Sequence, residues 1–126
     1  MPGVTYDAGA LVAADRSDRE IWALHKRALD RGIVPTVPAG VLAQGWRGGP
    51  QAQLSRFLKG CLIEDLDEPR ARSAGAACAL AKVADVVDAA VVVGASARRD
   101  VTVTSDPSDL AHIAEACGLT LIIEQI

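Results

Sequence analysis

The chain has 126 residues, of which half are apolar, 23% are charged and 3% are aromatic, and its formal net charge is −3. This length allows one domain with a buried core, and the slightly acidic balance argues against a protein that coats nucleic acid through bulk electrostatics. The chain lacks an apolar run of 18 residues and starts without a basic leader. We therefore expect one domain over residues 1–126, cytoplasmic and without a membrane segment.

The first third of the chain predicts a strand at residues 3–7 that ends in Asp7, followed by a helix from residue 8. At such a junction Asp7 is either a plain helix cap or a group that points outward from the carboxyl edge of the sheet. A second helix is expected at residues 17–30, with Ser17 as its N-cap and Glu20 completing a capping box. His25 lies on this helix among charged residues and is expected to be partly exposed.

The middle third predicts a strand at residues 33–37, then a helix that begins at Pro38 and runs to the glycines at positions 48 and 49. This helix would carry Gln44 and Arg47 on one side, because they are three residues apart. Trp46 is expected to pack in the core or at a subunit contact. A short helix at residues 51–59 and a strand at residues 61–66 follow.

The last part of the chain continues the alternation of helices and strands. Helices are predicted in the alanine-rich segment after residue 70 and from residue 85, with the helix-end cations Arg98 and Arg99 solvated. The buried strand VTVT spans residues 101–104, a helix occupies residues 108–117, and LTLII at residues 119–123 closes the sheet. The order predicts an α/β fold, a three-layer sandwich with a mostly parallel sheet of about five strands.

The cysteines do not indicate a disulfide framework or a zinc site. Cys61, Cys78 and Cys117 are odd in number, widely spaced and embedded in apolar segments. This pattern is typical of small buried hydrophobic residues in a reducing compartment.

Five aspartates are predicted to gather at the carboxyl edge of the sheet, where ligands bind in open α/β folds. Asp85 and Asp88 share a face in the first turn of one helix, Asp106 and Asp109 follow the strand at residues 101–104, and Asp7 ends the first strand. Crowded carboxylates repel one another unless a cation joins them, and a hard divalent ion with oxygen ligands is the usual solution. The pattern favours a Mg²⁺ or Mn²⁺ site.

Other interpretations of these charges remain open. Asp106 and Asp109 could be helix caps in the SDPSD turn, and Asp85 could merely complement a helix dipole. Between Asp30 and Glu64 there is no carboxylate, while four cations fall inside this gap: Arg31, Arg47, Arg56 and Lys59. They would form a basic rim for a phosphodiester substrate or, taken alone, ordinary solvated helix surface.

With these motifs in place, the chain resembles the PIN-domain family, and in particular the VapC-type toxin ribonucleases of bacterial toxin–antitoxin pairs. The resemblance covers nearly the whole length. The residues that carry it are Asp7 in TYDAGAL, the VLAQGWR segment, Asp88 in DAAVVVGASA, the turn Thr104-Ser105-Asp106, and Asp109 three residues later.

The resemblance implies a nuclease that cuts RNA phosphodiesters with Mg²⁺ or Mn²⁺, forms homodimers and is inhibited by a small cognate antitoxin. Asp7, Asp88 and Asp106 would hold the ion, supported by Asp85 and Asp109. Arg47 would grip the substrate phosphate or a carboxylate of the site, and Gln44 would orient a water.

Two positions depart from the family pattern. Gln44 stands where the family has Glu, and an amide oxygen can ligate a metal or a metal-bound water but cannot take a proton from it. Gly9 stands where the family commonly has a hydroxyl residue. The alternative to a nuclease is therefore a binding module that kept the fold and lost the chemistry. A phosphate-accepting receiver-like domain is set aside, because Asp7 has no acidic neighbour and no lysine follows Lys82.

Overall fold

Five parallel strands form one sheet in the computed structural model, which describes residues 2–126. The spatial order of the strands is β3-β2-β1-β4-β5, and every pair of neighbours is parallel. Their bounds are β1 Val4–Tyr6, β2 Thr36–Pro38, β3 Leu62–Glu64, β4 Val101–Thr104 and β5 Ile122–Gln125. The predicted α/β fold with a parallel sheet of about five strands is confirmed.

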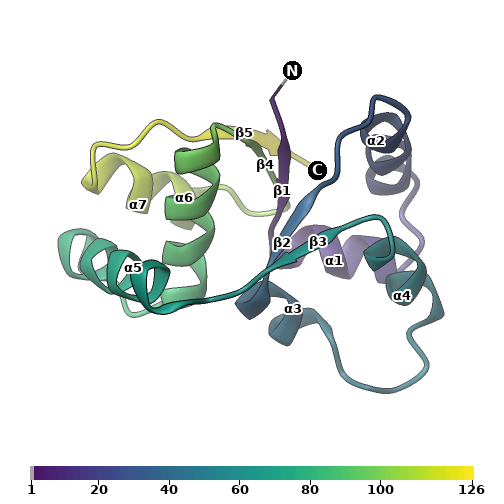
Figure 1. Ribbon diagram of the computed structural model, residues 1–126, viewed down its shortest axis with the longest axis horizontal. Coiled ribbons are helices and arrows are strands. Elements are labelled where there is room, and N and C mark those ends of the chain that lie inside the picture. Colours follow the sequence, from purple (N-terminus) through teal and green to yellow (C-terminus); the bar gives the residue numbers. More distant parts are fainter. Residues whose placement is uncertain (1) are drawn as a thin grey trace.

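Helices cover both faces of this sheet (Figure 1). Helices α5, α6 and α7 lie on one side of the central strands, and α1 to α4 lie on the other. Their bounds are α1 Ala8–Asp15, α2 Arg19–Asp30, α3 Ala39–Gly45, α4 Ala52–Leu58, α5 Glu68–Ala81, α6 Val86–Arg98 and α7 Ser108–Ala116. In the part of the chain that the structure describes, no helix has both the length and the apolar character needed to cross a bilayer.

Small aliphatic residues build the core, as the scarcity of aromatic residues requires. On α6, Ala89, Val91 and Val92 are fully buried, and on the central strands Tyr6 and Val103 are equally inaccessible. Both faces of β4 are covered, and its residues Thr102, Val103 and Thr104 are each at most 1% exposed. The short side chains of α5 and α6 let these two helices pack closely.

Tyr6, Trp22 and Phe57 form an aromatic cluster that also encloses His25, which is only 3% exposed. The Tyr6 hydroxyl and His25 Nδ1 are hydrogen-bonded at 2.7 Å, and the imidazole stacks on Phe57 with ring centroids 4.0 Å apart. Burial lowers the pKa of His25. The predicted partial exposure of His25 is therefore wrong, because Phe57 from a later helix covers a side chain whose sequence neighbours are charged.

Several element ends differ from the sequence prediction. The N-cap of α2 is Asp18, whose carboxylate accepts the amide hydrogens of Glu20 and Ile21. Ser17 instead has a left-handed backbone with φ of 60°. Strand β5 begins at Ile122 rather than at residue 119.

Helix α3 ends at Gly45, and Trp46 lies beyond it with 41% of its surface exposed. Trp46 is thus not a core residue. The three cysteines are free, as predicted, with Cys78 buried and the other two half-buried.

Candidate functional site

Asp7 is fixed at the carboxyl edge of the sheet by contacts with the end of β4. Strands β1 and β4 are neighbours, and the Asp7 amide donates to the carbonyl of Val103 at 3.0 Å. The Thr104 hydroxyl lies 3.0 Å from Asp7 Oδ2 and donates to it. The same hydroxyl accepts the Asp106 amide at 3.1 Å. The side chain of Thr104 therefore joins two of the predicted site aspartates.

The carboxylate of Asp7 is buried without full compensation. Asp7 is 8% exposed, and its Oδ1 has no hydrogen-bond partner among the described residues. Burial raises the pKa of Asp7, and the charges of Asp85 and Asp106 add to this, while the Ala8 amide and the Thr104 hydroxyl oppose it. Asp7 occupies the N-cap position of α1 but makes no side-chain capping bond. A buried carboxylate of this kind requires a proton or a cation.

Asp88 is the second perturbed carboxylate and lies in the first turn of α6. Burial raises its pKa to about 7, helped by the charges of Asp85, Asp7 and Asp109 and by a side-chain hydrogen bond with Asp85. Asp85 is the N-cap of α6 and accepts the amides of Val87 and Asp88, each at 3.0 Å. Asp85 therefore has a capping role in addition to its charge.

Asp106 and Asp109 occupy the turn and the first helical turn after β4. Asp106 is exposed, and its Oδ1 accepts the Ser108 hydroxyl at 3.0 Å, as in a local turn. Asp109 lines a small hollow of about 160 Å³ together with Asp85, Asp88 and His112. His112 is bonded through Nε2 to the carbonyl of Ala81 at 2.9 Å. The presence of His112 beside the aspartates was not predicted.

Within residues 2–126, no three His, Cys, Asp or Glu side chains lie together as a ready-made ligand set for a metal ion. The aspartates are nevertheless close enough to raise one another's pKa, and one buried oxygen of Asp7 has no partner. The available donors are carboxylate oxygens, which fit a hard divalent cation such as Mg²⁺. The roles assigned to Asp7, Asp88, Asp106, Asp85 and Asp109 stay predictions.

Gln44 lies on α3, which packs against α6 at the acidic end. A Cβ added to Gly40 would lie 3.1 Å from Val87, the residue before Asp88. Gln44 is four residues after Gly40 and so shares its helix face. The Gln44 side chain is exposed and makes no hydrogen bond to the part of the chain that the structure describes. Its predicted role stays a prediction.

Arg47 does not share a helix face with Gln44, because α3 ends before it. Its guanidinium donates to the carbonyls of Ala43 and Trp46, at 3.1 and 2.8 Å, and thereby satisfies the end of α3. Among the other cations of the predicted basic rim, Arg56 lies over the ring of Trp22, 5.1 Å from its centroid. Both arginines thus have structural contacts of their own.

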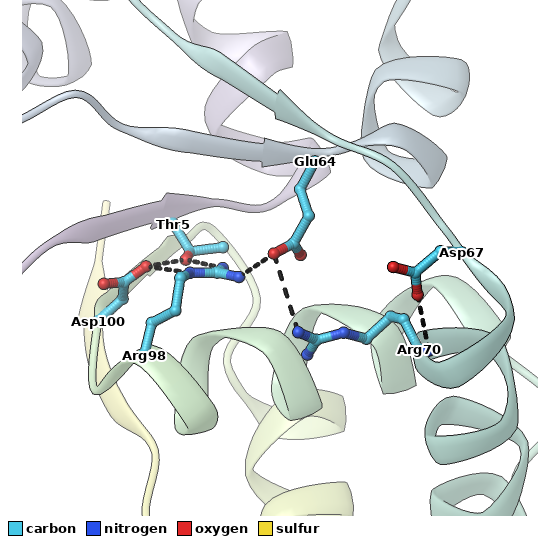
Figure 2. A network of polar contacts seen from close by, with 6 residues as sticks. All are labelled: Thr5, Glu64, Asp67, Arg70, Arg98 and Asp100. Atoms are coloured by element: carbon cyan, nitrogen blue, oxygen red, sulfur yellow. Dashed lines mark hydrogen bonds and ion pairs between the residues drawn. The ribbon is translucent and has the colours of Figure 1, made fainter.

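An ion-pair network that the sequence did not predict crosses the α6 side of the sheet (Figure 2). Arg98 donates to Asp100 and to the Thr5 hydroxyl, each at 2.9 Å, and pairs with Glu64. Figure 2 shows Arg70 reaching the same glutamate, at 3.9 Å. Arg98 is therefore not a solvated helix-end cation. It connects α6 with β1, β3 and the residue before β4.

Of three comparisons with known proteins, the one with solved structures places the fold. No family model matches the chain, and no curated protein matches it in sequence. Solved structures do match over nearly the full length. VapBC2 from Rickettsia felis bound to a DNA fragment from their promoter has a TM-score of 0.74 at 16% identity, covering 98% of both chains.

DNA-bound VapBC from Salmonella typhimurium has a TM-score of 0.70 at 19% identity, covering 99% of this chain and 98% of the other. PAE2754 from Pyrobaculum aerophilum has a TM-score of 0.65 at 14% identity, covering 93% and 98%. The resemblance to VapC-type PIN domains is thus confirmed at the level of the fold.

Proposed function

We propose that the chain is a metal-dependent endoribonuclease of the VapC type, the toxin of a toxin–antitoxin pair. The observation that carries this proposal is the buried carboxylate of Asp7, with one oxygen unpartnered, beside Asp88, whose pKa is raised to about 7. Two carboxylates perturbed by burial and by neighbouring aspartates at the ligand-binding edge of an α/β sheet are typical of a functional site. The similarity to VapBC complexes over the full length supports the same assignment.

In this proposal the chain positions oxygen ligands for Mg²⁺ or Mn²⁺. Thr104 holds Asp7 and the start of the Asp106 turn, and Asp85 fixes the first turn of α6 and with it Asp88. A bound divalent ion lowers the pKa of water and neutralises charge on the phosphate. A carboxylate binds the ion in its deprotonated form, so the raised pKa of Asp88 opposes metal binding at low pH. Gln44 orients the water through its amide.

The similar structures support an antitoxin as the proposed partner. Two of the similar structures are VapBC complexes bound to DNA. We infer that this chain binds a small cognate antitoxin, as the toxin chains of those complexes do. We also infer that it forms a homodimer and acts on RNA in the cytoplasm. Co-purification with the product of a small reading frame upstream tests the antitoxin.

The experiment for the nuclease uses the purified chain, labelled single-stranded RNA and Mg²⁺ or Mn²⁺. We expect cleavage that EDTA stops and that Asp7→Asn and Asp88→Asn each abolish. Asp65→Asn is the matched control, since Asp65 is exposed and makes no hydrogen bond or ion pair within residues 2–126. Unchanged cleavage in the first two variants would remove these residues from the mechanism.

A binding module without cleavage is the second candidate, and Gln44 is the observation that favours it. Without a carboxylate at this position, the site has one negative charge fewer to bind a metal ion, and the side chain at position 44 cannot take a proton from a water. Gln44→Glu separates the two candidates. A large gain of cleavage in an otherwise silent protein supports the binding module, and a modest change in an active protein supports the nuclease.

A further inference from the structure

A shallow groove runs along the exposed face of α1, next to the acidic site. It has a volume of about 390 Å³. Three of its residues lie on one face of α1, a fourth is the C-cap of that helix, and two more complete the lining. The six are Gly9, Val12, Ala13, Arg16, Asp18 and Ser105. At 1.5 Å per residue, the distance along the helix from Gly9 to Arg16 is about 10 Å.

Ser105 forms the end of the groove at the acidic site. It lies between Thr104, which is bonded to Asp7, and Asp106. A Cβ at position 9 would overlap the Ser105 hydroxyl and would lie 3.0 Å from both the Cβ and the backbone nitrogen of Ser105. Glycine at position 9 thus allows the turn after β4 to approach the first turn of α1, with the Ser105 hydroxyl in the space that a side chain would fill.

Arg16 forms the far end of the groove as the C-cap of α1. Its side chain is exposed and makes no ion pair within the described residues 2–126. The carboxylate of Asp18, the only acid that lines the groove, accepts the amides of Glu20 and Ile21 at 3.0 and 3.2 Å. The Asp18 carboxylate thus caps α2 and does not pair with Arg16, which leaves the Arg16 guanidinium available to an external anion.

We propose that this groove binds the stretch of single-stranded RNA backbone next to the phosphate that is cleaved. The Ser105 hydroxyl donates to a phosphate oxygen near the acidic site, and Arg16 pairs with a phosphate further along. The acidic site itself repels a polyanion, so the adjoining backbone must be held by an uncharged donor and a cation. This inference rests on the proposed action on RNA.

The test measures cleavage kinetics of the full chain on labelled single-stranded RNA. Ser105→Ala removes the hydroxyl and keeps the Cβ. The hydrogen bond to the phosphate is made in both the ground state and the transition state, so its loss should raise KM by roughly tenfold and leave kcat unchanged. Ser73→Ala, at an exposed serine of α5, is the matched control and should keep the parent KM.

Arg16 is tested by the salt dependence of RNA binding, measured by fluorescence anisotropy in EDTA. Arg16→Ala should lower the slope of log affinity against log salt by about 0.7, the value for one phosphate contact on a single strand. Arg27→Ala on α2 is the matched control, because Arg27 is also exposed but lies beside the amino ends of the central strands.

The contact between Gly9 and Ser105 has a separate readout in thermal stability. Gly9→Ala should lower Tm by several degrees, and adding Ser105→Gly should recover much of the loss, because the second change removes the overlapping side chain. If Gly9→Ala leaves Tm unchanged, the close approach that the groove depends on is refuted.

If the parent cleaves or binds RNA but Ser105→Ala and Arg16→Ala behave like their controls, the groove assignment is overturned and the nuclease proposal stands. If the parent neither cleaves nor binds RNA, both proposals are overturned.

Discussion

Replacing Asp88 by Asn should stabilise the metal-free protein at neutral pH. The pKa of Asp88 is about 7 in the folded state, against 3.8 for a free aspartate. The folded protein therefore holds a proton between about pH 4 and pH 7 that the unfolded chain has released. The protonated Asp88 therefore makes its full contribution to the free energy of unfolding below about pH 4, and this contribution is lost as the pH rises through 7. Asn mimics the protonated acid and can still donate to Asp85.

The size of the effect follows from the difference between the two pKa values. A shift of one unit corresponds to about 1.4 kcal/mol, so roughly three units set an upper limit of about 4 kcal/mol. Asp88 is only partly buried, and solvent screens its charge. We therefore expect Asp88→Asn to raise the free energy of unfolding by about 1–2 kcal/mol at pH 7.5 in EDTA, with no gain at pH 4.

Urea unfolding at a series of pH values measures this gain, with Asp65→Asn as the control that should leave the pH dependence unchanged. Equal stability of the parent and Asp88→Asn at pH 7.5, or a loss in the variant, would refute the idea that Asp88 carries uncompensated charge. The same variant reports on the metal. At a Mg²⁺ or Mn²⁺ concentration 100 times Kd, the parent should gain about 2.7 kcal/mol and Asp88→Asn much less.

Two further pairs of variants test the support of the site. Thr104→Val removes the hydrogen-bond donor to Asp7 and should lower the free energy of unfolding in urea by about 1–3 kcal/mol. Thr102→Val should be neutral or stabilising, because the Thr102 hydroxyl is buried without a partner in the described chain. Equal losses of stability in both variants would contradict this reasoning. Arg98→Met should cost about 2–4 kcal/mol, since it removes the ion-pair partner of Asp100 and the nearer of the two arginines that pair with Glu64. Arg99→Ala should lie within about 0.5 kcal/mol of the parent.

The sequence by itself determined the architecture and the edge of the sheet where the acids lie. The alternation of apolar runs with helical segments predicted a parallel sheet, and residues 101–104 form β4 as expected. Local chemistry was sufficient here, because strand and helix periodicity are encoded over a few residues. Asp7 and Asp106 each follow a strand, so the rule that parallel strands end at a common edge placed both at that edge. That β1 and β4 are neighbours was decided by the sheet.

Only the tertiary structure decided which side chains meet. Its sequence neighbours suggested that His25 is partly exposed, yet Phe57 buries it. Arg98 had the pattern of a solvated helix end, yet it pairs with carboxylates from two other segments. The close approach of Ser105 to Gly9 joins segments that no local pattern relates. Burial and pairing arise from contacts between residues distant in the chain, so they depend on the packed fold rather than on the local sequence.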